Sequence, residues 1–142
     1  MSAALLRSPI TRLFAEAFSQ GDLSVVDEVL TLEHFAHNTF GGSPNGPEGL
    51  KWLIATFRTA FPDLHCTVDD EINEGDRVAA RWTMRGTHKG LFLGSPPTGK
   101  SIEVQGIIFA RTENSRIIED WTLIDQLGIL QQLGLVPPPA GM

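Results

Sequence analysis

The spacing of apolar residues changes once along the chain, near Pro62. Before that residue, apolar positions recur with the helical period of 3.6. After it, they alternate with polar positions, as in β-strands. The pattern therefore predicts helices in the first part of the chain and a sheet in the second, rather than alternating βαβ units.

The first helix is expected in the segment SPITRLFAEAFSQG. Ser8 is a suitable N-cap, Pro9 suits the first helical position, and Gly21 follows the point where the helix should end. Five apolar residues of this segment recur at helical spacing and form one stripe that should be buried. They are Ile10, Leu13, Phe14, Ala17 and Phe18.

Two further helices are expected before the pattern changes. A short one covers about Leu23 to Thr31, and a loop rich in His, Asn and Gly follows it. Pro47 opens a longer helix, which Pro62 ends, because proline cannot continue a helix. The apolar residues of this longer helix also repeat at helical spacing, so one of its faces should be buried.

Four strands and a closing helix are expected after Pro62. The strands alternate apolar and polar residues and are joined by short polar turns or a longer loop. Their expected bounds are about Leu64–Ile72, Arg77–Arg85, Ser101–Arg111 and Arg116–Ile124, and the helix covers about Gln126–Leu133. The segment GTHKGLFLGSPPTGK joins the second and third strands, and residues 90–100 within it form either a turn or a lid.

This order of elements predicts an α+β fold, with the N-terminal helices packed on a curved antiparallel sheet. Nothing in the pattern indicates a repeat, a linker or a second domain, so residues 1–142 are expected to form one domain. A curved sheet closed on one side by helices makes a cone, and the interior of such a cone can hold a small apolar ligand.

Composition narrows the class of protein. The chain is 42% apolar and 20% charged, with a net charge of -6, which argues against a nucleic-acid partner because such proteins need a clustered basic surface. No apolar run approaches the roughly 20 residues that cross a bilayer, and Arg7 and Pro9 interrupt the N-terminal apolar stretch before it could serve as a secretory signal. The single cysteine, Cys66, is expected to be a small core residue, and a cytoplasmic location is the default expectation.

Several segments together resemble a known family. They are FPDL after the third helix, GTHKG followed by GSPPTGK, and the ending RIIEDWTLIDQLGILQQLG. In this order they resemble the SnoaL-like polyketide cyclase family, which has the cone-shaped NTF2-like fold. The resemblance implies a homodimer or higher homo-oligomer packed through the outer sheet face. It also implies aldol ring closure without cofactor or metal, with one aspartate as general acid and base in an apolar pocket.

Side chains alternate between two faces along the last strand. One set is Ile118, Asp120, Thr122 and Ile124, and the other is Ile117, Glu119, Trp121, Leu123 and Asp125. The resemblance places the catalytic aspartate of the family on Thr122 and a pocket histidine near Ile108, so both groups are absent from those positions. A threonine hydroxyl cannot act as a general base near neutral pH.

Asp120 is the available substitute for the missing aspartate. It shares a face with Thr122 and lies roughly 6–7 Å away along the strand. We therefore expect Asp120 to be the general base, in a pocket with Thr122 and Ile108 in its lining and Trp82 and Trp121 as its walls. The alternative for Asp120 is a solvated or salt-bridged carboxylate, and the alternative for Trp121 is packing or an interface.

The remaining charged groups of this region have structural interpretations. Asp125 directly precedes the closing helix, where it is expected to cap the amides of Leu127 and Gly128. The alternative for Asp125 is a catalytic role in the pocket, because the resemblance also places an acid at this position. Glu119 is expected to pair with a strand arginine such as Arg81. Arg81 shares a strand face with other arginines that should pair with acids on neighbouring strands, although it could also clamp a substrate carboxylate.

The four histidines differ in what they could do. His34 and His37 have a spacing that could serve a metal, but no further histidine or cysteine cluster supports one, so no metal is expected. The resemblance places His37 at the mouth of the pocket, where it would orient or polarise a substrate carbonyl, since imidazole can exchange protons near neutral pH. The alternative for His37 is a loop histidine whose hydrogen bonds are satisfied within the protein. His34 and His65 are expected to be exposed. His88 is expected either to fix the following loop by a hydrogen bond or to line the pocket.

Two functions remain open at this point. The first is an enzyme that performs acid–base chemistry, either aldol cyclisation or isomerisation, on a small hydrophobic carbonyl compound. Asp120 and His37 would be its catalytic residues. The second is a non-catalytic ligand-binding or assembly module that kept the cone but lost the catalytic aspartate, which the presence of Thr122 favours.

Overall fold

Five strands form one curved sheet in the order β1-β5-β4-β3-β2. The computed structural model describes residues 7–40 and 43–137 of the chain. The strands are β1 Leu30–Ala36, β2 His65–Glu74, β3 Arg77–Thr87, β4 Ser101–Glu113 and β5 Arg116–Ile124. Neighbours from β2 to β5 pair antiparallel, whereas β1 pairs parallel to β5. The predicted antiparallel meander is therefore confirmed, with one parallel strand added at its edge.

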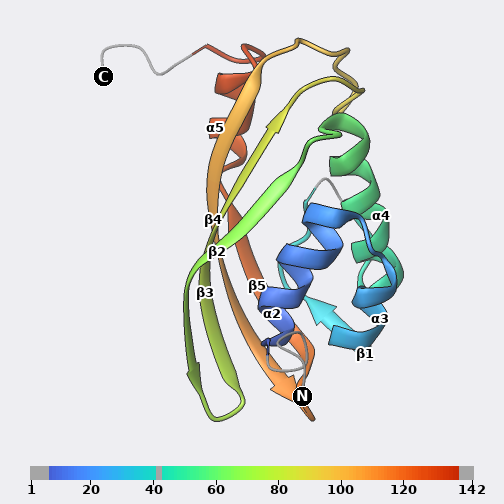
Figure 1. Cartoon of the computed structure of the whole chain (residues 1–142), viewed down its shortest axis with the longest axis vertical. Helices are drawn as coiled ribbons and strands as arrows, with labels where there is room; N and C mark the ends of the chain where they lie inside the picture. Colours follow the sequence, from blue (N-terminus) through green and yellow to red (C-terminus); the bar gives the residue numbers. More distant parts are fainter. Residues whose placement is uncertain (1–6, 41–42, 138–142) are drawn as a thin grey trace.

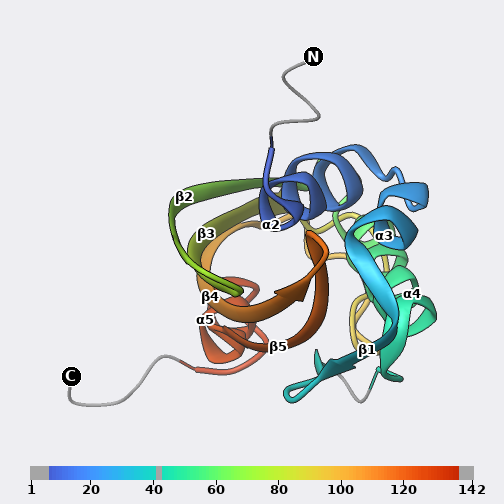
Figure 2. The same ribbon diagram turned by 90° about the horizontal axis from the view of Figure 1, so that it is seen from below.

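The N-terminal helices cover one side of this sheet. The helical elements are α2 Pro9–Arg12, which continues as the π-helix η1 Leu13–Phe18, then α3 Ser24–Val29, α4 Gly46–Ala60 and α5 Gln126–Gln132. Figures 1 and 2 show α2, α3 and α4 gathered with β1 against the concave side of the curled strands. Helix α5 follows β5 and lies beside the first residues of β4, where Gln132 bonds to the backbone of Glu103. The α+β fold with helices packed on a curved, unclosed sheet is thus confirmed.

The first helix begins where its capping residue predicts. The amide of Thr11 donates to Ser8 Oγ at 3.0 Å, and Pro9 occupies the first turn. All five residues of the predicted apolar stripe are buried. The second half of this helix has π rather than α hydrogen bonding, and Ser19 Oγ donates to the Phe14 carbonyl at 2.8 Å. Short π-helical segments within helices are frequent at functional sites. Phe14 and Phe18 belong to this one.

Strand β1 is the element that sequence analysis missed. The short second helix was expected to extend to Thr31, but it ends at Val29, and the chain then continues as a strand. Simple alternation from Leu30 would turn Leu32 inward, yet Leu32 is 85% exposed because the pairing with β5 shifts register between Leu30 and Phe35. A strand with an interrupted period of two carries little local signal.

A bulge in β5 changes which residues face inward. Thr112 pairs with Ile117 and Arg111 pairs with Glu119, so Ile118 is an extra residue in the ladder. Ile117 is completely buried and Ile118 only partly so. The expected faces were therefore wrong for Ile117 and Ile118, because strict alternation fails across a bulge. Beyond it, the faces follow the expected alternation.

Asp125 caps the closing helix, as predicted. Its carboxylate accepts a hydrogen bond from the Gly128 amide at 2.9 Å. We expect the substitution Asp125→Ala to lower the free energy of unfolding by about 1 kcal/mol, the usual effect of losing an N-cap acceptor. Urea denaturation followed by circular dichroism measures this change. Asp125→Asn is the control, since asparagine caps equally well, and equal losses in both variants would contradict the capping role.

Cys66 is a buried core residue, as predicted. Burial raises the pKa of its thiol to about 12, so the group stays protonated and unreactive near neutral pH.

Among the described residues, no helix combines the length and the apolar content that crossing a bilayer requires.

Candidate functional site

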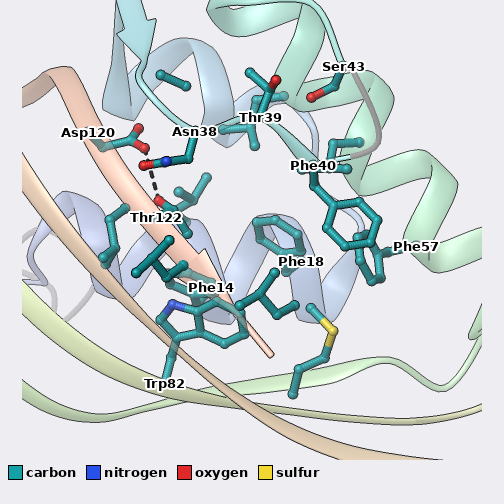
Figure 3. A pocket seen from close by; sticks show the side chains of 18 of the residues that line it. Phe14, Phe18, Asn38, Thr39, Phe40, Ser43, Phe57, Trp82, Asp120 and Thr122 are labelled. Carbon is teal, nitrogen blue, oxygen red and sulfur yellow. Dashed lines mark hydrogen bonds between the residues drawn. The ribbon is translucent and has the colours of Figure 1, made fainter. Parts of the chain in front are cut away.

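A cavity of about 300 Å³ lies between the concave face of the sheet and the N-terminal helices. Its walls are mostly apolar, and Figure 3 shows Phe14, Phe18 and Trp82 on one part of the wall and Phe40 and Phe57 on another. A smaller set of polar side chains interrupts this lining. They are His34, Asn38, Thr39, Ser43, Asp120, Thr122 and Gln126. An apolar chamber with a few convergent polar groups is typical of sites for small organic ligands.

Asp120 projects into this cavity from the middle of β5. Its residue is only 8% exposed, and a carboxylate in such surroundings needs hydrogen-bond donors. Two are present. His34 Nε2 lies 2.6 Å from Asp120 Oδ2, and Thr122 Oγ1 donates to Asp120 Oδ1 at 2.9 Å. Both carboxylate oxygens are therefore held from the protein side.

His34 reaches Asp120 through the pairing of β1 with β5. Ala36 is the register partner of Asp120, and the amide of His37 donates to the Asp120 carbonyl at 2.9 Å. His34 is only 6% exposed, so the expectation that it is exposed was wrong. The error follows from the missed strand, since a loop at this position would have left the imidazole in solvent.

Trp82 forms a rigid part of the cavity wall. Its ring stacks on Phe14 with 4.9 Å between ring centroids, and it also lies close to Gly106, its register partner on β4. A Cβ atom at Gly106 would lie 2.1 Å from the indole ring. Glycine at this position therefore allows the ring to lie flat on the sheet. Ile108, two residues further along β4, also lines the cavity.

His37 and Trp121 lie on the opposite, outer side of β5. The two rings stack with 4.2 Å between centroids, and His37 Nε2 lies 2.9 Å from Glu119. Neither side chain lines the cavity. The predicted placements of His37 at the pocket mouth and of Trp121 as a pocket wall therefore differ from the structure. Alternation explains the difference, because the neighbours of an inward residue point outward.

Glu119 pairs with Arg111 rather than with Arg81. Arg111 Nε donates to it at 2.7 Å, and the hydrogen bonds from Arg111 and then His37 hold the pKa of Glu119 below its ordinary value. The predicted pairing was wrong because Arg81 is directed to Asp69 on β2, with 3.7 Å between the charged atoms. Arg81 lies along a second, open groove on the outer sheet face, away from the cavity.

His88 is also outside the cavity lining. It is completely buried, and its Nδ1 accepts a hydrogen bond from the Thr98 amide at 3.2 Å. Its ring packs near Phe61 and Phe92. Of its two predicted roles, the structure matches the hydrogen bond that fixes the loop and not the one in the pocket.

Comparison with known proteins identifies the family. A sequence profile described as SnoaL-like polyketide cyclase matches residues 9–133. The chain belongs to this family. The SnoaL-like assignment covers every helix and strand described above, and it includes the cavity, Asp120 and both of its hydrogen-bond partners.

Individual relatives agree with the SnoaL-like assignment. The chain is 29% identical over 138 residues to the aklanonic acid methyl ester cyclase DnrD of Streptomyces peucetius, covering 93% of this chain and 94% of that one. Among solved structures, TsrD from Streptomyces laurentii is 29% identical with a TM-score of 0.83, covering 96% and 99% of the two chains. IdmH from Streptomyces antibioticus is 35% identical with a TM-score of 0.76, covering 89% and 96%.

Proposed function

We propose that this SnoaL-like protein binds a small hydrophobic carbonyl compound in the cavity and acts on it by acid–base chemistry that needs no cofactor. The reaction is an aldol cyclisation or an isomerisation, and Asp120 is the general base. The observation that carries the proposal is the buried carboxylate of Asp120 in the wall of an otherwise apolar chamber. A carboxylate in such a chamber is close to bound substrate and largely shielded from bulk water, which favours proton abstraction from carbon.

The reaction begins with removal of a proton next to the substrate carbonyl. Asp120 takes the proton, the electron pair of the broken C–H bond forms an enolate, and the carboxylate becomes a carboxylic acid. In a cyclisation, the enolate carbon attacks a second carbonyl of the same molecule, and the resulting alkoxide recovers the proton from Asp120. In an isomerisation, Asp120 returns the proton to a different carbon. Either sequence leaves the protein unchanged.

The enolate oxygen needs hydrogen-bond donors during this step. The side chains of Asn38, Thr39, Ser43 and Gln126 line the same cavity and supply amide or hydroxyl donors. Figure 3 shows Asn38 on the side of Asp120 and Thr122. These groups take the role that the sequence analysis gave to His37, which was to polarise the substrate carbonyl, because the imidazole of His37 lies on the outer face with Glu119.

Proton abstraction can be tested without knowledge of the natural substrate. The bicyclic ketone 2-tetralone is incubated with the protein in D₂O, and exchange of its α-protons is followed by NMR. Exchange above the buffer rate supports the proposal. Ring closure is tested separately with aklanonic acid methyl ester, the compound in the name of the DnrD relative. Absence of both reactions would reject the proposed enzyme.

A non-catalytic binding module is the second candidate. It is favoured by Thr122, which stands where the resemblance places the aspartate of the family and which bonds to Asp120. The same tetralone samples distinguish the two functions. Saturable binding of 2-tetralone without α-proton exchange, measured by calorimetry and NMR, would favour the module, whereas exchange would favour the enzyme.

We also propose that the protein is a homodimer or larger homo-oligomer that packs through the outer sheet face. Ile107, Phe109 and Leu123 are exposed there, next to Trp121. A cluster of exposed apolar side chains on one face is typical of an interface. The partly exposed ion pair of Glu119 with Arg111 lies on the same face.

Light scattering after gel filtration tests this assembly. We expect a mass of at least two chains at micromolar concentration, and Leu123→Glu should shift the protein towards a monomer because it buries a charge at the interface. Leu91→Glu is the matched control, since Leu91 is 62% exposed, close to the 69% of Leu123, but lies in the loop after β3. A wild-type monomer would contradict the proposed assembly.

A further inference from the structure

We infer that His34 is a positioning residue for Asp120, and that the two form an acid–base pair built from different positions than the resemblance indicates. The inference rests on the proposed function, because it assigns a role within the same cavity. The resemblance places an aspartate on Thr122 and a histidine near Ile108. Instead, an aspartate two residues earlier and a histidine from another strand meet in this cavity, 2.6 Å apart.

The surroundings of the imidazole indicate where its proton lies. His34 Nε2 faces Asp120, whereas Nδ1 is buried and has no hydrogen-bond partner among the described residues. A proton on Nδ1 would therefore be a buried donor without an acceptor, which is unfavourable. A proton on Nε2 has the carboxylate as its acceptor. The favoured arrangement is a neutral imidazole that donates from Nε2 to an ionised Asp120.

This arrangement divides the work between the two residues. Asp120 is the only member of the pair that gains and loses the substrate proton, and His34 remains neutral throughout. The imidazole stabilises the carboxylate in an apolar chamber and fixes its orientation, together with the hydroxyl of Thr122. Each carboxylate oxygen keeps a further lone pair after accepting one hydrogen bond. Either oxygen can therefore still accept a proton from substrate.

The backbone makes the geometry of the pair reproducible. His34 lies on β1 and Asp120 on the adjacent β5, and the two strands are joined next to the pair by the hydrogen bond from the His37 amide to the Asp120 carbonyl. Groups held on paired strands are positioned more accurately than groups on loops. Since misplacing a reacting group by about 1 Å can lower a rate on the order of 100-fold, positioning of this kind has a measurable effect.

NMR of the histidine ring nitrogens tests the pair without any turnover. At pH 8, long-range ¹H–¹⁵N spectra of the wild-type protein should show His34 as the neutral tautomer protonated on Nε2. In Asp120→Ala the population of this tautomer should fall towards that of an unpartnered histidine, in which the Nε2-protonated form is still the major one. His65 is the internal control, since it is exposed and should not respond to the substitution. A mixture of tautomers at His34 in the wild type, or no response to Asp120→Ala, would overturn the inference.

Kinetics test the positioning role directly. In the 2-tetralone exchange assay, His34→Leu should lower kcat by about 10–100-fold with KM little changed, because the base remains but is no longer held. His34→Gln should recover part of the loss, since the amide nitrogen of glutamine can occupy the place of Nε2. Equal losses in both variants, or none in His34→Leu, would reject the role of His34.

The two experiments separate the inference from the proposed function. If wild-type protein exchanges no protons, the proposed enzyme fails, while the NMR result still decides whether the pair exists. If wild-type protein is active but His34 shows no preferred tautomer, the enzyme stands and the pair fails. Should His34→Leu not fold, the wild-type tautomer and His34→Gln still decide the question.

Discussion

Replacing Asp120 by asparagine is expected to lower the rate of α-proton exchange from 2-tetralone by about 10²–10⁴-fold, the usual effect of losing a general base. Asparagine has nearly the shape of aspartate. Its amide oxygen can still accept the hydrogen bond from His34, while its NH₂ group can donate to the hydroxyl of Thr122. It cannot accept a proton near neutral pH, however. The expected loss therefore appears in kcat, with a small change in KM. Initial rates of deuterium incorporation over a range of ketone concentrations measure both constants.

Glu119→Gln is the matched control for this substitution. Glu119 is the adjacent acid on the same strand, but it points to the outer face and pairs with Arg111. The control removes one carboxylate charge from the residue next to Asp120, whose Cα atom lies about 3.8 Å from that of Asp120. It therefore tests whether a general loss of negative charge in this region lowers the exchange rate. We expect its exchange rate to match the wild type. An Asp120→Asn variant that keeps the wild-type rate would contradict the assignment of the base.

The substitution Gly106→Ala is expected to destabilise the protein by about 1–3 kcal/mol, which is typical of overpacking a filled core. The added methyl group would lie 2.1 Å from the Trp82 ring, far inside van der Waals contact. Trp82 has little freedom to move away, since it is buried and Phe14 stacks on its ring. Urea denaturation followed by circular dichroism measures the change in the free energy of unfolding.

A double-mutant cycle shows whether the contact with the indole is the cause. Trp82→Phe removes the part of the ring that a methyl group at Gly106 would meet. The double variant should therefore lose less stability than the sum of the two single variants. Additive losses would indicate that the alanine acts elsewhere. Gly106→Ala should also narrow the cavity, because the added methyl group would push Trp82, which forms part of the cavity wall, towards the interior.

The helices and the meander could be predicted because their signals are local. Ser8 and Pro9 marked the start of the first helix, and the capping of the last helix by Asp125 follows from the residue type and its position. Strands β2 to β5 alternate over enough residues to be recognised. Strand β1 lacks such a pattern, since its pairing with β5 is interrupted and Leu32 points to solvent.

The candidate site was predictable only where it depends on one strand. Asp120 and Thr122 share a face by simple alternation, and the structure places both at the cavity. The contact between His34 and Asp120 joins positions 86 residues apart. No local pattern encodes such a contact, and it became visible only when β1 was placed beside β5. For His37, the resemblance located the right loop, but the direction of its side chain depends on that same missed strand.

The additional residue in β5 has a consequence for comparing this chain with its relatives. Removing Ile118 would leave Ile117 facing inward and Glu119 facing outward, so a homologue one residue shorter would keep the same inner surface. If two such homologues are aligned across this point without a gap, inward-facing residues of one are matched with outward-facing residues of the other on one side of the bulge. Correspondence of functional groups between them is therefore read most safely from superposed coordinates.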